Sequence, residues 1–134
     1  MLTVGIMLQP GAEHTSSLTV RHEDTAEAMG SGDMPVLATP RMAALMENAA
    51  MTAVAGMLDE GSTTVGGHID ISHLKPTPVG AQVSATATLE KVEGRKLHFR
   101  VVAAEAGGDI IGEGTHLRFI VDREKFLSKI KGQK

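Results

Sequence analysis

The sequence contains no cysteine, no tryptophan and no tyrosine, and it has only three phenylalanines. Without cysteine, the chain can form no disulfide framework, thiol nucleophile or cysteine-based zinc site. With so few aromatic side chains, the core has to be built from aliphatic residues, alanine and the eight methionines. This composition predicts a thin core of helix packed on sheet, or a core completed by a partner chain.

Long apolar runs and an excess of positive charge are also missing. No apolar stretch approaches the ~20 residues of a membrane-spanning helix, and the N-terminus lacks the basic region of a signal peptide. The net charge is −3, which gives no support for nucleic-acid binding. We therefore expect a cytoplasmic protein that binds neither membranes nor nucleic acid. Its 134 residues most simply form one domain, residues 1–134.

One cationic cluster stands at the C-terminus and consists of Lys125, Lys129, Lys131 and Lys134. Lysines are favourable at the end of a solvated helix because they complement the helix dipole. Contact with a phosphate-bearing ligand is the alternative.

Periodicity predicts one long helix and several strands. Thr39 suits the N-cap and Pro40 the first helical position, and apolar residues then recur at helical steps to position 58. Gly61 is expected to end this helix in a left-handed conformation. Period-two patterns predict strands over 2–8, 14–22, 63–73, 82–92, 95–105 and 109–121, a loop over 23–34, and a terminal helix over 122–131 capped by Asp122. An early helix followed by hairpin-connected strands is typical of an α+β fold.

Glu47 is the one acid within the apolar part of the long helix. It shares a stripe with Thr39 and Ala43, because residues four apart are neighbours on a helix. A buried carboxylate without a partner is costly, so Glu47 requires a partner group or a solvent-filled cleft. The alternatives are an exposed stripe of the helix or a pair with Arg41 or another local base.

Two segments carry a family resemblance: ATPRMAALMENAA at 38–50 and GGHIDISHLKPTPVG at 66–80. Together they resemble the fluoroacetyl-CoA thioesterase-like group of hot-dog thioesterases, over about residues 30–121. In that group the site consists of a Thr at the helix start, a Glu two turns later and a His on the following strand. The matching catalytic residues are Thr39, Glu47 and His73. The resemblance implies a long central helix wrapped by a curved antiparallel sheet, and hydrolysis of a small acyl-CoA thioester to free acid and CoA.

Two features of the strand after the helix need a separate interpretation. His73 ends the strand and could exchange protons near neutral pH. His68 lies five residues earlier and so faces the other side of a regular strand; the spacing to Glu47 selects His73. The pair Gly66-Gly67 either forms a β-bulge or, as the resemblance implies, lets backbone N–H groups approach the thioester carbonyl.

Arg118 is a candidate for binding a phosphate or the pantetheine of CoA, and an exposed strand arginine is the alternative. The six histidines form no HExxH motif, and no GxSxG motif occurs, so we expect neither a metal nor a cofactor. The resemblance also implies a homodimer, possibly a tetramer, because pairing of sheets covers exposed strand edges.

Other functions on the same fold remain to be separated. A non-catalytic acyl-CoA or metabolite-binding protein would keep the cleft but would not need Glu47. A hydratase would need an Asp/His motif that the sequence lacks. The stretch SGDMPVLA at 31–38 corresponds to an aromatic lid in the fluoroacetyl-specific member of the group but contains no aromatic residue. We therefore expect another small acyl group, or broad hydrolysis, rather than specificity for fluoroacetyl-CoA.

Overall fold

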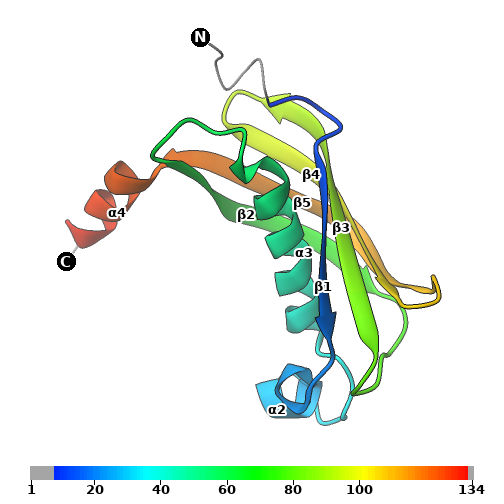
Figure 1. The fold of residues 1–134 in the computed structure, drawn as a ribbon. Coiled ribbons are helices and arrows are strands. Elements are labelled where there is room, and N and C mark those ends of the chain that lie inside the picture. Colours follow the sequence, from blue (N-terminus) through cyan, green and yellow to red (C-terminus); the bar gives the residue numbers. More distant parts are fainter. Residues whose placement is uncertain (1–7, 133–134) are drawn as a thin grey trace.

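A curved antiparallel sheet wraps one long helix in the computed structural model, which describes residues 8–132 (Figure 1). The strands run in the order β1-β3-β4-β5-β2, and all neighbouring pairs are antiparallel. This arrangement confirms the predicted hot-dog fold. The elements in chain order are β1 (Glu13–Thr19), the 3₁₀ helix η1 (His22–Asp24), α2 (Ala26–Met29), α3 (Thr39–Ala55), β2 (Ser62–His73), β3 (Gln82–Glu93), β4 (Lys96–Glu105), β5 (Ile110–Asp122) and α4 (Arg123–Lys131).

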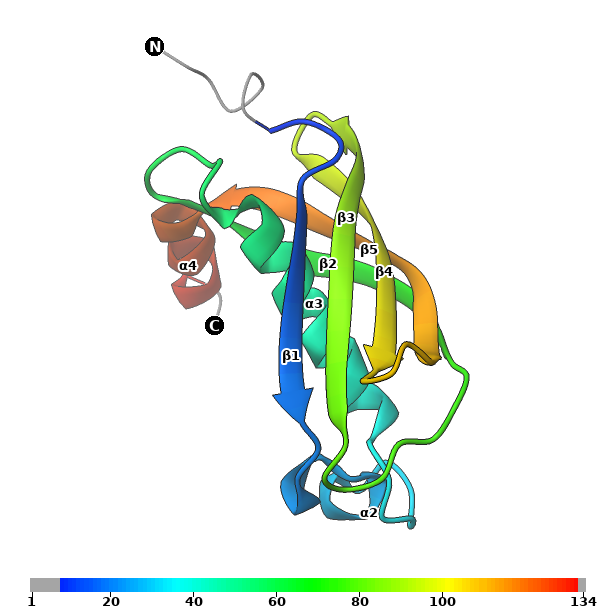
Figure 2. The ribbon, with the colours of Figure 1, turned by 45° about the vertical axis from the view of Figure 1, so that its right-hand side comes forward.

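The core lies between α3 and the concave face of the sheet (Figure 2). Alternate residues of β3 and β4 point inward, as expected for strands with one buried face. Much of this inner layer is small, because alanines are buried both on β3 and on α3, which lets the helix approach the strands closely. The buried residues of the helix are Met42, Leu45, Met46, Ala49, Ala50, Ala53 and Val54. Their helical spacing confirms the predicted apolar face.

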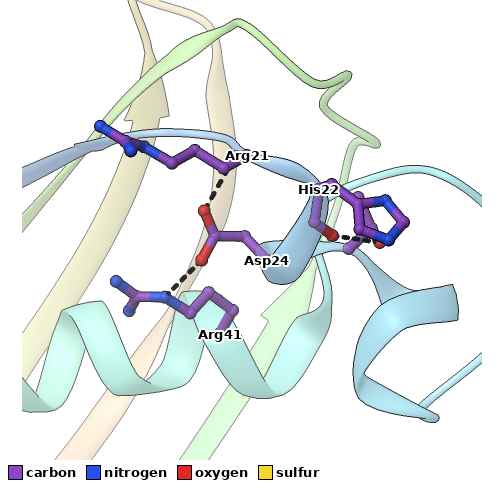
Figure 3. Close-up of polar contacts among 5 residues, drawn as sticks. Arg21, His22, Asp24 and Arg41 are labelled. Carbon is purple, nitrogen blue, oxygen red and sulfur yellow. Dashed lines mark hydrogen bonds and ion pairs between the residues drawn. The ribbon is translucent and has the colours of Figure 1, made fainter.

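The start of α3 is fixed by Asp24, a buried residue of η1 (Figure 3). Its carboxylate accepts hydrogen bonds from Arg41 Nε at 3.0 Å and from the Arg21 backbone N–H at 2.9 Å. Its carbonyl oxygen accepts the Ala38 N–H at 2.9 Å. Side chain and main chain of one residue thus tie the first turn of the helix to the segment before it. Arg41 is therefore committed to Asp24, and the alternative of a Glu47–Arg41 pair is wrong.

The N-cap of α3 is Ala38, which corrects the expected Thr39 cap. The physical reason is that the Thr39 hydroxyl is hydrogen-bonded to a side chain outside the helix, described below. The N–H of Ala38 donates to the carbonyl oxygen of Asp24. The helix also ends earlier than expected, at Ala55. Gly61 has the expected positive φ of 86°, but it lies in the turn before β2 rather than at the helix end.

Other boundaries also differ from the prediction. The segment 23–34 is not only loop, because Thr25 caps the short helix α2 by accepting the Ala28 N–H. The strand expected over 14–22 is β1, Glu13–Thr19. The four later strands and the terminal helix are confirmed within a few residues, and Asp122 caps α4 by accepting the Lys125 N–H. The strand expected over 2–8 falls almost entirely outside the described residues.

Helix α4 extends away from the body of the protein at the end of β5 (Figure 1). All of its residues are exposed. Lys129 and Lys131 lie in the last turn of this solvated helix and Lys125 in the first turn, while Lys134 is outside the described range. None of the helices within residues 8–132 has the length and apolar character needed to cross a bilayer.

Candidate active site

Thr39 and His73 meet where the first turn of α3 lies beside the last residue of β2. The Thr39 hydroxyl and His73 Nδ1 are hydrogen-bonded at 2.7 Å. The other ring nitrogen, Nε2, is buried and has no hydrogen-bond partner within residues 8–132. Burial lowers the pKa of His73, and the backbone at Lys75 opposes this shift in part. His73 is therefore mainly neutral at pH 7 and available as a proton acceptor.

A cavity of about 380 Å³ opens beside this pair. Residues 31–34 form one wall, and Leu74 and Lys75 form another. The stretch that corresponds to the lid of the resembled group thus lies over the Thr39–His73 pair. Its largest side chain there is Met34, which is exposed. The volume is at the lower end of the range for small-molecule sites, so the cavity has room for a short acyl chain.

Glu47 belongs to a second group of polar side chains, two turns further along α3. The rise of an α-helix places it roughly 12 Å from Thr39 along the helix axis. Its carboxylate is half-buried, and it forms no hydrogen bond or ion pair within the described part of the chain. Glu47 is thus a carboxylate at the edge of the core that is not neutralised by a direct partner.

The surroundings of Glu47 are defined by Gly66. A Cβ atom added to this glycine would lie between three groups, at 3.3 Å from Glu47 Oε2, 3.3 Å from His116 Cε1 and 3.4 Å from Arg118 Nη1. Gly66 has no positive φ, so the backbone does not demand glycine. The absence of a side chain instead lets the carboxylate and the guanidinium lie close to the Gly66 backbone.

A β-bulge brings Gly66 to this position. In the pairing of β2 with β5 the register shifts between Gly66 and His68, which leaves Gly67 as the extra residue. Gly66 pairs with Arg118 and His73 with Gly112, and directly paired residues share one face. Without the bulge, Gly66 and His73 would face opposite sides, because they are seven residues apart.

Gly67 is needed for a different reason than Gly66. A Cβ atom there would approach the ring of Phe119 to 2.4 Å, so the aromatic ring covers the bulge. The predicted bulge is confirmed. The proposed approach of backbone N–H groups to a thioester remains a prediction.

Arg118 is 7% exposed, so the alternative of an exposed strand arginine is wrong. Nε donates to the Thr64 hydroxyl at 2.8 Å, and Nη2 donates to the Thr64 carbonyl at 3.0 Å. Nη1 lies 3.1 Å from His116 Nε2. Burial lowers the pKa of Arg118 and the charge of Glu47 opposes this, but a guanidinium stays protonated in proteins. A fixed positive charge therefore faces the space next to Glu47.

The structure brings Thr39 together with His73, and Glu47 together with Gly66 and Arg118. It does not bring these two groups together within one chain. Another residue of this group, His116, was not singled out from the sequence and is 1% exposed. A signal was present: two polar residues two apart on a strand, His116 and Arg118, occupy the same face.

The fold and these side chains together define a hot-dog thioesterase. The chain is 42% identical over 114 residues to the fluoroacetyl-CoA thioesterase of Streptantibioticus cattleyicolor. The aligned region covers 84% of this chain and 81% of that protein. The chain belongs to the fluoroacetyl-CoA-specific thioesterase family, whose sequence model matches residues 20–124.

Solved structures agree with this assignment. A variant of the fluoroacetyl-CoA thioesterase in complex with acetyl-CoA superposes with a TM-score of 0.88 at 33% identity, covering 94% of this chain and 98% of that one. A thioesterase superfamily member from Thermus thermophilus superposes with a TM-score of 0.85 at 30% identity, covering 92% and 90%.

Proposed function

We propose that this protein hydrolyses thioesters of CoA with small acyl groups, and that Glu47 is the group that starts the reaction. The observation that carries this proposal is the unpaired Glu47 carboxylate, which lies beside the Gly66 backbone and near the Arg118 guanidinium. A half-buried anion near a fixed cation, at a position where the strand carries no side chain, suits attack on a polarised carbonyl. A protein that only binds acyl-CoA would not need this carboxylate.

Two chemical routes are open to Glu47. As a nucleophile, one carboxylate oxygen attacks the thioester carbonyl carbon, the C–S bond breaks, and water hydrolyses the resulting anhydride. As a general base, the carboxylate takes a proton from the attacking water. In both routes the neutral His73 imidazole accepts the proton lost by the attacking water and passes it to the CoA thiolate, and Thr39 orients the imidazole through its 2.7 Å hydrogen bond.

The negative charge that develops on the thioester oxygen needs donors. Backbone N–H groups at Gly66-Gly67 or at the start of α3 are candidates, and each such donor is worth ~3 kcal/mol in the transition state. Arg118 points into the same space, so we assign it to the reacting end of the substrate rather than to the CoA phosphates.

A complete site requires a second copy of the chain. Strand β2 lies at an edge of the sheet, and sheet edges invite pairing. If two β2 strands pair antiparallel about a two-fold axis at Asp70, with Gly67 again the unpaired bulge residue, Gly66 lies opposite the partner subunit's His73. Glu47 would then share a site with the partner's Thr39–His73 pair. We propose such a homodimer, located in the cytoplasm with its acyl-CoA substrates.

The direct test is thiol release from a panel of acyl-CoA thioesters, measured with Ellman's reagent. Hydrolysis of acetyl-CoA, propionyl-CoA and fluoroacetyl-CoA is expected to be faster than that of long-chain thioesters, because the cavity is small. Tight binding without thiol release would support the non-catalytic alternative and overturn the proposal. Hydration of an enoyl-CoA without thiol release would indicate a hydratase.

Replacing Gly66 with Ala should reduce thioester hydrolysis by about 10–100-fold, because a 1 Å displacement of reacting groups has effects of this size. The methyl group would occupy the space in front of Glu47 Oε2 and Arg118 Nη1. The backbone conformation accepts alanine, but Glu47, His116 and Arg118 must shift slightly to make room for the methyl group, so the melting temperature is measured in parallel. Gly56→Ala is the matched control, because a Cβ atom there meets nothing within 4 Å. Full activity of Gly66→Ala would show that the substrate does not enter this space.

The pH dependence should show His73 acting in its neutral form. Because burial lowers its pKa below the ordinary 6.5, kcat/KM should be lost only as the pH falls through that lowered pKa. Asp33 and Lys75 are the charged residues that line the cavity beside it. The residual activity of His73→Gln should lack this acidic limb. An acidic limb with a midpoint above pH 6.5 in the wild-type profile would contradict the assignment.

A further inference from the structure

His116 is a buried titratable group next to Arg118 for which the proposed mechanism has no role. It lies on β5 with its ring 6.4 Å from that of Phe99, and both of its nitrogens have partners. Nδ1 lies 2.7 Å from the carbonyl oxygen of His68, the residue that follows the bulge. Nε2 lies 3.1 Å from Arg118 Nη1.

These two partners select one form of the imidazole. The carbonyl of His68 can only accept, so His116 Nδ1 must carry a proton. The guanidinium of Arg118 can only donate, so Nε2 must be the acceptor. The result is a neutral ring that receives a hydrogen bond from a cation. A protonated ring would place two donors and two positive charges against each other and break this contact.

Arg118 is therefore held at each of its three nitrogens. The Thr64 hydroxyl accepts a hydrogen bond from Nε and the Thr64 carbonyl accepts one from Nη2. His116 Nε2 accepts the hydrogen bond from Nη1. Only the bond from His116 restrains the nitrogen that faces the Gly66 space, where Glu47 Oε2 also lies. Without it, Nη1 keeps no protein acceptor within the described residues, and its position next to Glu47 is set only by the Thr64 contacts.

We propose that His116 is a positioning residue, which holds the Arg118 guanidinium beside Glu47 and anchors the strand immediately after the Gly67 bulge. This inference rests on the proposed function, because it assigns His116 a part in the reaction that starts at Glu47. His116 itself does not touch the substrate. Its effect passes through the orientation of Arg118.

Two substitutions separate the two contacts of the ring. In His116→Gln the amide oxygen can occupy the place of Nε2 and accept from Arg118. In His116→Asn the amide N–H can occupy the place of Nδ1 and donate to His68, but the side chain is too short to reach Arg118. We expect about a 100-fold loss of kcat for His116→Asn with little change in KM, since misplacement of a transition-state contact has an effect of this size. His116→Gln should retain kcat within about threefold, because the acceptor that His116 offers Arg118 is restored.

A double-mutant cycle with Arg118→Ala completes the test. If His116 acts through Arg118, His116→Asn should have almost no additional effect on kcat once Arg118 is alanine. Melting temperatures of all variants are measured in parallel. If His116→Asn does not fold, kcat is compared for His116→Gln alone and for His116→Gln combined with Arg118→Ala.

The outcomes distinguish this inference from the proposed function. The inference is overturned if His116→Gln is as impaired as His116→Asn, if His116→Asn keeps full kcat, or if the effects of the two sites multiply. The proposed function fails separately, through absence of thiol release in the wild-type protein or full activity without the Glu47 carboxylate.

Discussion

Replacing Glu47 with Gln should lower kcat for acyl-CoA hydrolysis by about 10²–10⁴-fold, the range for removal of an essential acid–base group. Loss of a nucleophile would have at least this effect. The amide has nearly the shape of the carboxylate but can neither attack a carbonyl nor take a proton from water. Because Glu47 makes no hydrogen bond or ion pair in the described structure, the substitution breaks no direct contact and removes only the longer-range attraction between Glu47 and Arg118.

Activity and stability are measured together for this variant. The melting temperature of Glu47→Gln should stay close to that of the wild-type protein, so loss of thiol release would report chemistry rather than unfolding. Glu60→Gln is the control, since Glu60 is an exposed acid outside the site. Full activity of Glu47→Gln on every substrate of the panel would contradict the mechanism. Single-turnover hydrolysis in heavy-oxygen water then separates the two routes, because only a nucleophile acquires the label in its own carboxylate.

The sequence was sufficient to predict the fold and to identify candidate site residues. The helical spacing of Met42, Leu45 and Met46 and the alternation in β3 and β4 correspond to the buried faces in the structure. The matched motif identified Thr39 and His73 as candidates, but the hydrogen bond between them was not predicted. Local patterns are informative where the buried face of an element is fixed by its period.

The surroundings of Glu47 depend on the register between strands β2 and β5, which a local sequence pattern does not determine. Gly66-Gly67 was compatible with a bulge, but which glycine is the extra residue follows only from the pairing of β2 with β5. That pairing places Gly66 next to Arg118 and aligns Ile69 with His116. These residues are about fifty positions apart in sequence, so no spacing rule connects them.

The helix start was misjudged for a similar reason. A threonine before a proline is a good N-cap in isolation, but the Thr39 hydroxyl has a partner in His73. The backbone of Asp24 satisfies Ala38 instead. The Thr39 hydroxyl could bond either to a backbone N–H of α3 or to a side chain elsewhere. Local propensity favours the first, and the tertiary contact with His73 selects the second.

The central claim is that Glu47 and His73 act on one thioester from two different chains. Each of the variants Glu47→Gln and His73→Gln should be strongly impaired alone. In a dimer that contains one chain of each kind, one site lacks both groups and the other site keeps both. Random mixing should therefore restore about one quarter of the wild-type activity, because half of the dimers are mixed and each has one intact site.

Mixed dimers are made by unfolding and refolding the two variants together, and their mass in solution is measured in the same sample. Separately refolded variants, combined without further unfolding, are the control and should stay inactive until subunits exchange. The account predicts recovery of thiol release to about one quarter of wild type in the co-refolded sample only. A co-refolded dimer as inactive as either parent, or a wild-type protein that is active as a monomer, would contradict it.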